Sequence, residues 1–482
     1  MLKRIAKAFI GLMCLQLIIG IIFNKPLTTH AKDKYILAVG AADGPFGRIK
    51  SDGSYEGIDL ELIGAIAELE GFEVEFRPLA FSAGVLAVES GQVDGIIAAM
   101  SITEERKKTF DFSDPYFESG LVFGVHKDSD INDPKELNGK NVAIKNGTSG
   151  AMVAEELQPE FGYTLTTFED SPSMYEDVAT GNSVGVFEDG SLMTYAINVG
   201  GAPVRMIGEE MEVDEYGMAV LKGNNPELIE MFNDGLKKLK ESGEYDAIIE
   251  RNLGGEAKEK NEAEGASFVD LFKTHRKALL SGLGTTLWMT VLSILIATVF
   301  GLLIGLMRTS DSTVLKAIST LYIDLIRGVP LIVLAFFIYF GLPQTFDFRL
   351  SSYVAGLITL ILNASAYLGE IVRSGIQAVD KGQTEAAYSS GLTYWQTMRY
   401  VIMPQALRII TPSYLNQMII TLKDTSILSV IGLVELTQAG KIIISSNFQS
   451  GKMWMMVALM YFIVITILSK LSNYIDRHYH TY

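Results

Sequence analysis

Cysteine and histidine are scarce in this sequence. Of its 482 residues, one is cysteine, Cys14, and five are histidine. A single cysteine excludes an intramolecular disulfide and a cysteine-based metal site. The sequence also lacks a convincing set of nucleophile, base and acid, so we expect neither catalytic residues nor a metal site in this chain.

The phosphate-binding loop of nucleotide hydrolases is missing as well. The pattern G-x-x-x-x-G-K-[ST] occurs nowhere, and the Gly-containing stretches NGTSG (146–150) and SGLGTT (281–286) have no lysine. Phosphate and magnesium binding by such a loop depend on that lysine and on the hydroxyl that follows it. We therefore expect that the chain has no cofactor of its own and does not hydrolyse ATP.

Charge is divided unequally along the chain. Residues 32–253 contain 42 acidic and 18 basic side chains, whereas residues 267–482 contain 10 and 16. Phosphate binding needs a basic face, and the acidic first half argues against a nucleic-acid partner. Together with a mean hydropathy of +0.25, this division indicates a soluble part joined to a membrane part.

The N-terminus has the pattern of an export signal. Basic residues precede an apolar run at 8–23, and the sequence THA at 29–31 offers a small-residue cleavage site. We expect residues 1–31 to be a signal peptide. The run is also about as long as a short membrane helix, which leaves an uncleaved anchor open.

Short apolar strands alternate with amphipathic helices through residues 32–253. YILAVGA (35–41) predicts a strand and DLELIGAIAELEG (59–71) a helix, and further pairs follow. This alternation predicts an α/β domain. The next stretch, GGEAKEKNEAEGA (254–266), has no aromatic or β-branched residue and predicts a flexible linker that spans roughly 20 Å.

Five hydrophobic runs follow, each near the ~20 residues that a helix needs to cross a bilayer. They lie at residues 279–307, 317–342, 353–372, 409–436 and 454–471. We expect residues 267–482 to form an all-α domain with five spans, surrounded by membrane lipid. If the signal exports the α/β domain, the first run enters from outside, and most basic residues of the connections then lie inside.

A polar segment, EAAYSSGLTYWQTMRYVIMP (385–404), separates the third run from the fourth. Gly391 breaks its helical pattern, and Pro404 is expected to end it before the next span. The spacing of E-A-A, G and V-I-M-P resembles the coupling loop of ABC importer permeases, which seats in a groove of a separate ATPase subunit. The resemblance implies an ATPase partner that supplies ATP and magnesium, with the loop built on Glu385, Ala386, Ala387, Gly391 and Pro404.

Most of the membrane half resembles the polar amino-acid permeases of this type. The likeness is carried by YIDLIRGVPLIVLAFFIYFGLP, NASAYLGEIVRSGIQAVDKGQ and PSYLNQMIITLKDTSILSVIGLVEL. Five spans are half of the usual permease pair, so the resemblance implies a homodimer. Charged residues inside the runs either line a path or form structural pairs. They are Arg327, Glu370, Lys423 and Asp424.

The first half resembles the periplasmic amino-acid-binding proteins, which have two lobes and a hinge. Residues 79–120 and 215–254 carry the likeness. It implies a first lobe of residues 34–120 and 215–253 and a second lobe of residues 122–207. A buried α-amino acid needs charge-matched partners for its carboxylate and its ammonium.

In the first lobe, the resemblance assigns the ligand carboxylate to Arg106, assisted by Ser101 and backbone groups near Ala99. Arg106 lies in the first turn of a predicted helix that Thr103 can cap. Phe81 matches an aromatic wall for the apolar stem of the ligand. From the pattern alone, Arg106 would be a surface arginine in a charged run and Phe81 a core residue.

In the second lobe, Asp189 matches the aspartate that binds the ligand ammonium, although an ordinary turn would look the same. Thr148 and Ser149 match loop positions that bond to the ligand, and a capped helix is the plain alternative. Lys145 favours glutamine or glutamate as the ligand, whereas an acidic pair, Asp43 and Glu188, favours a cationic amino acid such as arginine. The sequence leaves the ligand open.

Taken together, the resemblances imply a substrate-binding and permease subunit of an ABC importer for a polar amino acid, with glutamine first and arginine as the alternative. The expected location is a bacterial cell membrane, with the binding domain outside and the coupling loop in the cytoplasm. A ligand-gated channel or membrane sensor is a further alternative. In such channels the spans are inserted between the segments of the lobes, whereas here the returning segment is complete before the first span.

Overall fold

The computed structural model describes residues 34–40, 42–49, 54–253, 267–346, 348–447 and 449–479. The expected signal peptide (1–31) and linker (254–266) lie outside the described residues. The chain forms two compact units. The binding unit comprises Met1–His275, Phe340–Leu350 and Lys441–Met453, and the membrane unit comprises Arg276–Tyr339, Ser351–Gly440 and Trp454–Tyr482.

The first lobe of the binding unit is built on a five-stranded sheet with the order β5-β1-β6-β13-β7. Its strands are β1 (Lys34–Gly40), β5 (Glu73–Leu79), β6 (Gly95–Ile97), β7 (Phe110–Phe112) and β13 (Ala219–Leu221). β1 is parallel to β5 and β6, whereas β13 is antiparallel to β6 and β7. A small sheet adds β2 (Ala42–Asp43), β3 (Gly47–Ile49) and β4 (Tyr55–Glu56).

Four helices bury the core of this lobe. They are α2 (Ile58–Glu70), α3 (Phe81–Glu89), α7 (Pro226–Ser242) and α8 (Glu244–Leu253). α2 ends at Gly71, whose φ of 78° is the left-handed conformation that glycine adopts without strain. Ile63 and Ile66 of α2 and Phe232 of α7 are fully buried in one cluster. The strand expected at 35–41 and the helix expected at 59–71 are therefore confirmed to within one residue.

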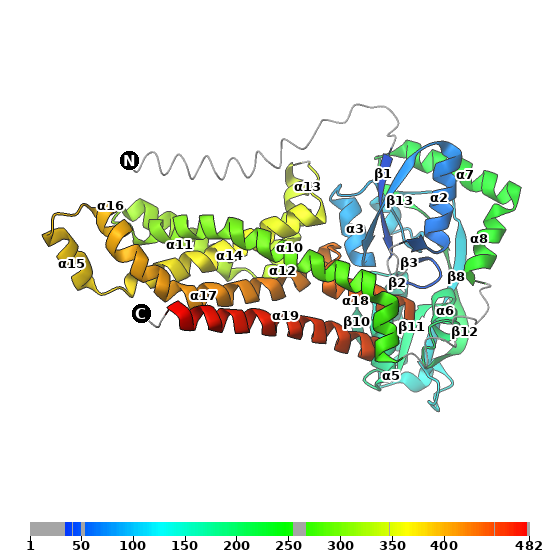
Figure 1. Ribbon diagram of the computed structural model, residues 1–482. Helices are drawn as coiled ribbons and strands as arrows, with labels where there is room; N and C mark the ends of the chain where they lie inside the picture. The colour runs from blue at the N-terminus through cyan, green and yellow to red at the C-terminus, as the bar shows by residue number, and fades with distance from the viewer. Residues whose placement is uncertain are drawn as a thin grey trace. The chain divides into compact units, whose positions relative to one another are not determined.

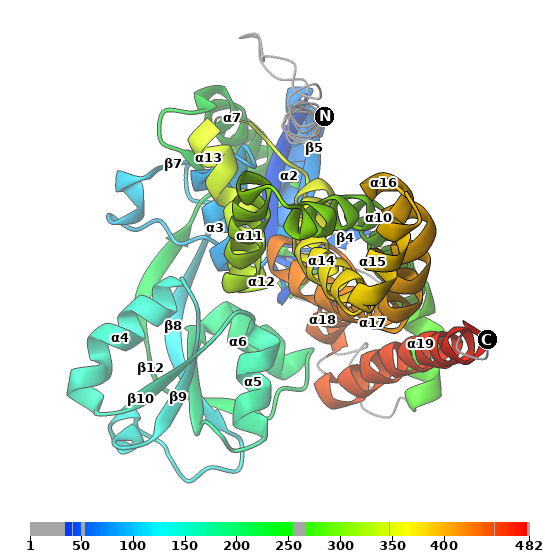
Figure 2. The same ribbon diagram turned by 90° about the vertical axis from the view of Figure 1, so that its left-hand side faces the viewer.

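The second lobe is a five-stranded sheet with the order β10-β9-β11-β8-β12. Its strands are β8 (Phe117–His126), β9 (Asn141–Lys145), β10 (Thr164–Phe168), β11 (Gly185–Asp189) and β12 (Val204–Tyr216). Figure 2 shows α4 (Ser149–Phe161) on one face of this sheet and α5 (Ser171–Ala179) and α6 (Gly190–Asn198) on the other. Each face has its own buried cluster, as expected for an α/β sheet covered on both sides.

Two long strands, β8 and β12, connect the lobes. Their antiparallel register runs from Val204 opposite His126 to Tyr216 opposite Phe117. An isolated bridge then joins Tyr216 to Ser101 of the first lobe. The last strand of the second lobe thus continues past Ile207, where we expected that lobe to end.

The segment at Arg106 differs from the predicted helix. It is a single 3₁₀ turn, η1 (Arg106–Lys108). Thr103 Oγ1 does accept a hydrogen bond from the Arg106 amide at 3.2 Å. Because β7 begins at Phe110, the chain has no room for a further helical turn.

Among the described residues of the C-terminal half, three helices are long and apolar enough to cross a membrane, or up to five if each bent pair is one span. The three are α10 (Phe268–Thr309), α14 (Ser352–Gln377) and α19 (Ser450–Tyr479, apolar up to Tyr474). Figure 1 shows α10, α14 and α17 (Met403–Asp424) running along one another. Small residues allow this close packing: a Cβ on Gly305 of α10 would lie 2.5 Å from Val372 of α14.

The second and fourth hydrophobic runs are broken rather than straight. α11 (Thr313–Gly328) bends by 102° into a stretch that contains α12 (Leu331–Phe336), the π-helical η3 (Phe337–Gly341) and α13 (Leu342–Phe346). Pro330 at this bend has no amide hydrogen to continue the first helix. The fourth run bends by 45° after η5 (Thr425–Ile431), where Gly432 adopts a φ of 75°, and continues as α18 (Leu436–Asn447).

Candidate ligand-binding site and coupling segment

Arg106 lies where the two lobes meet. Its Nη1 donates to the Ser101 carbonyl at 2.8 Å, and its Nη2 donates across the cleft to the Gly147 carbonyl at 2.9 Å. Its guanidinium carbon also stands 5.2 Å from the ring centre of Phe81, a cation–π distance. Burial lowers the pKa of Arg106 to about 10, and the carboxylates of Asp214 and Asp189 act against this shift.

The first lobe brings the other expected ligand residues to the same place. Phe81 at the start of α3 is 5% exposed. Ala99 has a φ of 47°, and its amide donates to Asp59 Oδ2 at 2.8 Å. That bond holds the strained backbone before Ser101, whose hydroxyl lies 2.8 Å from the Ser149 hydroxyl of the second lobe. Phe81, Ser101 and Arg106 are therefore close to one another, as the resemblance implies.

Asp189 ends β11 and points toward the hinge. It is 6% exposed, and its Oδ1 accepts a hydrogen bond from the Tyr216 hydroxyl. Burial raises the pKa of Asp189 to about 7, and the neighbouring carboxylate of Glu188 acts in the same direction. Burial also raises the pKa of Tyr216, so its hydroxyl stays protonated and donates. A buried carboxylate of this kind gains from a cationic partner.

Lys145 and Glu188 form a buried pair near Asp189. Lys145 Nζ lies 4.0 Å from Glu188 Oε1, and both side chains are at most 6% exposed. Glu188 also accepts from the hydroxyls of Ser171 and Tyr175. Burial raises the pKa of Tyr175, which therefore remains a donor to Glu188.

Thr148 has a structural task in addition to its predicted position in the site. Its Oγ1 accepts from the Ala151 amide at 3.1 Å and so caps α4, and it donates to the Lys145 carbonyl at 2.9 Å. Thr148 therefore fixes the turn that carries its neighbour Ser149 toward Ser101.

Two residues of β12 near the site escaped the sequence reasoning. Tyr216 bonds to Asp189, and Asp214 lies two positions earlier on the same face of the strand. Asp214 Oδ2 is buried and has no hydrogen-bond partner among the described residues. Exposed residues on the other face, Val213 and Glu215, give an alternation that could have indicated these inward positions.

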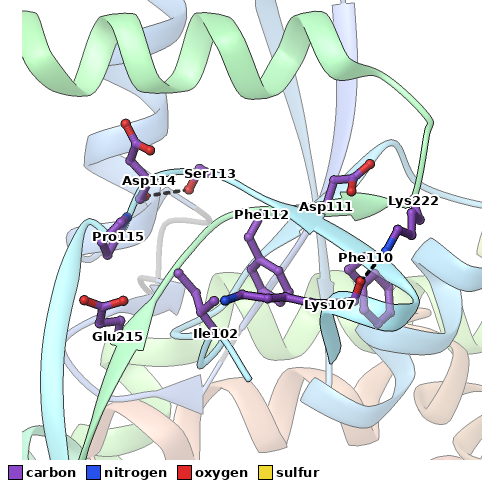
Figure 3. Close-up of a pocket in the computed structure, with 10 residues that line it drawn as sticks. All are labelled: Ile102, Lys107, Phe110, Asp111, Phe112, Ser113, Asp114, Pro115, Glu215 and Lys222. Atoms are coloured by element: carbon purple, nitrogen blue, oxygen red, sulfur yellow. Dashed lines mark hydrogen bonds between the residues drawn. The ribbon is translucent and has the colours of Figure 1, made fainter. Parts of the chain in front are cut away.

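The cleft itself is closed in this structure. Besides Arg106 with Gly147, the lobes meet where Ser82 donates to Glu169 at 2.8 Å. A separate open pocket of about 420 Å³ lies on the first lobe near the hinge strand (Figure 3), and none of the expected ligand residues lines it. Figure 3 shows that it is lined from η1, from β7 and the loop after it, and from the C-terminal end of β12, by Ile102, Lys107, Phe110, Asp111, Phe112, Ser113, Asp114, Pro115, Glu215 and Lys222.

The coupling segment, residues 385–404, is the part of the chain that resembles a coupling loop. It comprises the end of one helix, a turn and the start of a second helical stretch. α15 (Lys381–Ser389) carries Glu385, Ala386 and Ala387 and ends before Gly391, whose φ is 80°. α16 (Tyr394–Thr397) then begins with a capping box between Thr393 and Gln396. Glu385 is exposed, and so are the large rings of Tyr388, Trp395 and Tyr400.

Pro404 does not end this segment, contrary to our expectation. It lies in the first turn of α17, and helical structure is continuous from Tyr394 onward through the π-helical turn η4 (Met398–Ile402). The wider π turn and a first-turn position allow a proline, which lacks an amide hydrogen, inside an unbroken helical stretch.

The charged residues inside the hydrophobic runs are mostly paired. Glu370 bonds to Arg308 at 2.6 Å and also to Arg373. Arg327 stands 4.8 Å from the ring centre of Tyr367. Asp424 accepts from Asn363 Nδ2 at 3.2 Å. Glu370 thus belongs to a structural cluster.

Comparison with known families gives one match for each half of the chain. Residues 36–255 match the bacterial extracellular solute-binding proteins, family 3. Residues 278–481 match the inner membrane component of binding-protein-dependent transport systems. The first match ends two residues into the expected linker (254–266), and the second begins after it.

Individual proteins resemble each half. The glutamine transport system permease protein GlnP of Escherichia coli (strain K12) is 40% identical over 200 residues, which are 41% of this chain and 91% of that protein. The probable amino-acid ABC transporter permease protein YckA of Bacillus subtilis (strain 168) is 40% identical over 204 residues, 42% of this chain and 90% of that protein. A solved structure of an ancestral arginine-binding protein bound to glutamine is 35% identical and covers 47% of this chain and 100% of that one, with a TM-score of 0.44.

Proposed function

The chain belongs to the amino-acid permeases of binding-protein-dependent transport systems, with a family 3 solute-binding domain fused to its permease domain, and we propose that its cargo is glutamine. Fusion makes the receptor and the permease of this ABC transporter one polypeptide. Because the permease half belongs to this family, we infer an ATPase partner: in these transporters a separate subunit hydrolyses ATP.

The charge balance of the cleft carries the proposal. Arg106 and Lys145 contribute two positive charges, and Glu188 and Asp189 contribute two negative ones. These four groups sum to zero and favour a ligand that is itself neutral overall, because any excess charge would be desolvated without a partner. Arg106 is assigned to the ligand carboxylate and Asp189 to its ammonium.

The side chain of glutamine suits the remaining pair. A carboxamide accepts through its oxygen and donates through its nitrogen. Lys145 is a donor and Glu188 an acceptor, so together they match both ends of the amide. The permease half is also similar to a glutamine transport system permease.

Arginine is the second candidate, and Asp214 is the observation that favours it. Its buried, unpartnered Oδ2 adds a third carboxylate near Arg106 and Asp189. A cationic ligand would compensate that charge. Calorimetric titration of the purified full chain with each common amino acid separates the two: saturable heat with glutamine and none with arginine supports the proposal, and the reverse result replaces glutamine by arginine.

We further propose that the binding domain lies outside, that the coupling segment faces an ATPase in the cytoplasm, and that two copies of the chain form the transporter. Both connections expected outside, Phe340–Leu350 and Lys441–Met453, belong to the same compact unit as the binding domain, which supports the orientation. The exposed rings of Tyr388 and Trp395 offer an apolar docking surface on the coupling segment. Exposed Asp324 of α11 supports the dimer, because a charge on a membrane helix needs a protein neighbour.

A further inference from the structure

A short strap, residues 348–350, contacts the first lobe within the binding unit. Arg349 Nη2 lies 2.7 Å from Asp94 Oδ1, and its Nη1 lies 3.3 Å from Asp94 Oδ2. The Gln92 side chain forms hydrogen bonds with the backbone on both sides of Arg349. Its Nε2 donates to the Phe348 carbonyl at 3.3 Å, and its Oε1 accepts from the Leu350 amide at 3.0 Å. In sequence, the strap connects the second hydrophobic run to the third.

From this geometry we propose that the strap is the docking site for the first lobe, and that Arg349 is its recognition residue. The inference rests on the proposed function, since docking matters only if the receptor feeds the permease. The partner is a part of the same chain, 255 residues away in sequence from Asp94.

The fold of the first lobe holds the Asp94 carboxylate in place. Asp94 lies just before β6 and is 2% exposed, and its Oδ2 also accepts from the Ile36 amide of β1 at 2.9 Å. The carboxylate is thus fixed in position before an arginine approaches. A guanidinium that meets a carboxylate through two nitrogens adds directional specificity to charge attraction.

The glutamine contact fixes the register of the strap. Gln92 is fully buried, and its one amide group satisfies a carbonyl and an amide hydrogen of the strap backbone. A shift of the strap by one residue would break both bonds and move Arg349 away from Asp94. Hydrogen bonds to both a carbonyl and an amide of the strap indicate a specific binding site, because a chance surface contact would satisfy one of these backbone groups or neither.

The contact surface formed by Gln92 and Asp94 is separate from the ligand cleft. Gln92 and Asp94 precede β6, whereas Arg106 and Ser101 follow it. Changes at Arg349 should therefore alter docking and leave ligand affinity unchanged. Because receptor and permease share one chain, their effective concentration is on the order of millimolar, and a contact of modest strength suffices.

The test is uptake of radiolabelled glutamine by the full chain with its ATPase in proteoliposomes, for Arg349→Glu and for a matched control, Lys273→Glu. Lys273 is an exposed cation of the same unit at the start of α10. We expect Arg349→Glu to slow uptake at least fivefold, Lys273→Glu to leave the rate within twofold, and both to bind glutamine as the parent does. Equal uptake rates in the two variants would refute the role of Arg349 in docking and leave the proposed function intact.

A double-mutant comparison tests whether Arg349 acts through Asp94, which a single variant does not show. Asp94→Asn keeps an acceptor for the Ile36 amide and removes the charge. If Arg349 and Asp94 act as a pair, the variant with both Arg349→Ala and Asp94→Asn is no slower than either single variant, whereas independent effects would multiply.

Hydrogen exchange tests the strap even if the parent transports no amino acid, an outcome that would refute the proposed function alone. The Leu350 amide should be protected in the parent, and Gln92→Ala should raise its exchange rate at least tenfold. Exchange in the parent as fast as that of an unbonded loop would overturn the inference.

Discussion

Ligand affinity should depend on pH through Asp189. Its pKa is raised to about 7 because it is buried between the lobes, with Glu188 and Asp214 acting in the same direction and Tyr216 and Lys145 opposing. A ligand ammonium needs the ionised carboxylate. One pH unit below the pKa, only about a tenth of the sites are ionised, so affinity should be about tenfold weaker at pH 6 than at pH 8 and level above that.

The raised pKa of Asp189 also determines how the free energy of unfolding of the ligand-free protein changes with pH. The folded state holds the proton more tightly than the unfolded state, so this contribution is fully present below the ordinary pKa of 3.8 and is lost as the pH rises through about 7. A shift of about three units corresponds to roughly 4 kcal/mol. Ligand binding near neutral pH should therefore release a proton.

The assay is calorimetric titration of the full chain with glutamine from pH 5.5 to 8.5, in buffers of different ionisation enthalpy. At pH 6 the observed heat should depend on the buffer, because the released proton is taken up by it. Asp189→Asn serves as the control and should bind weakly with no dependence on pH. An affinity that varies less than twofold over the whole range in the parent chain would refute the reasoning.

Three further outcomes are expected. Arg106→Ala should weaken ligand binding at least a hundredfold by calorimetry while the melting curve stays cooperative; unchanged affinity would remove Arg106 from the carboxylate site. Glu385→Lys should abolish ATP-driven uptake and leave ligand affinity intact, and surviving uptake would contradict the coupling assignment. Gly305→Leu should reduce the yield of folded protein in size-exclusion chromatography because its Cβ would meet Val372 at 2.5 Å, whereas Gly284→Leu, with open space around it, should not.

Fold class was predictable because each half of the chain repeats a simple pattern. Period-two runs next to helical periods located β1 and α2 to within one residue, and long apolar runs located the membrane helices. The bends escaped prediction. Pro330 and Gly432 lie inside runs whose hydropathy is continuous, and hydropathy does not report the direction of a helix axis.

The candidate site was predicted in part for a similar reason. The resemblance located Arg106, Phe81 and Asp189, and the structure brings the first two into contact. The Tyr216 bond to Asp189 was not foreseen, because it depends on the register of β12 against β8. The short 3₁₀ turn at Arg106 was also missed, since the position of the next strand limits its length.

The helical stretch from Tyr394 to Ile431 connects the exposed polar segment to the bend at Gly432 without a break. Its α-helical part α17 alone has 22 residues and is about 33 Å long at 1.5 Å per residue, and the exposed Trp395 lies near one end of the whole stretch. If the stretch moves as one body, a small tilt about its Trp395 end becomes a larger displacement at Ile431. The π turn η4 lies between Trp395 and α17 and changes the helical phase there, so Trp395 lies on a different face of the stretch from the one that a regular α-helix would give it.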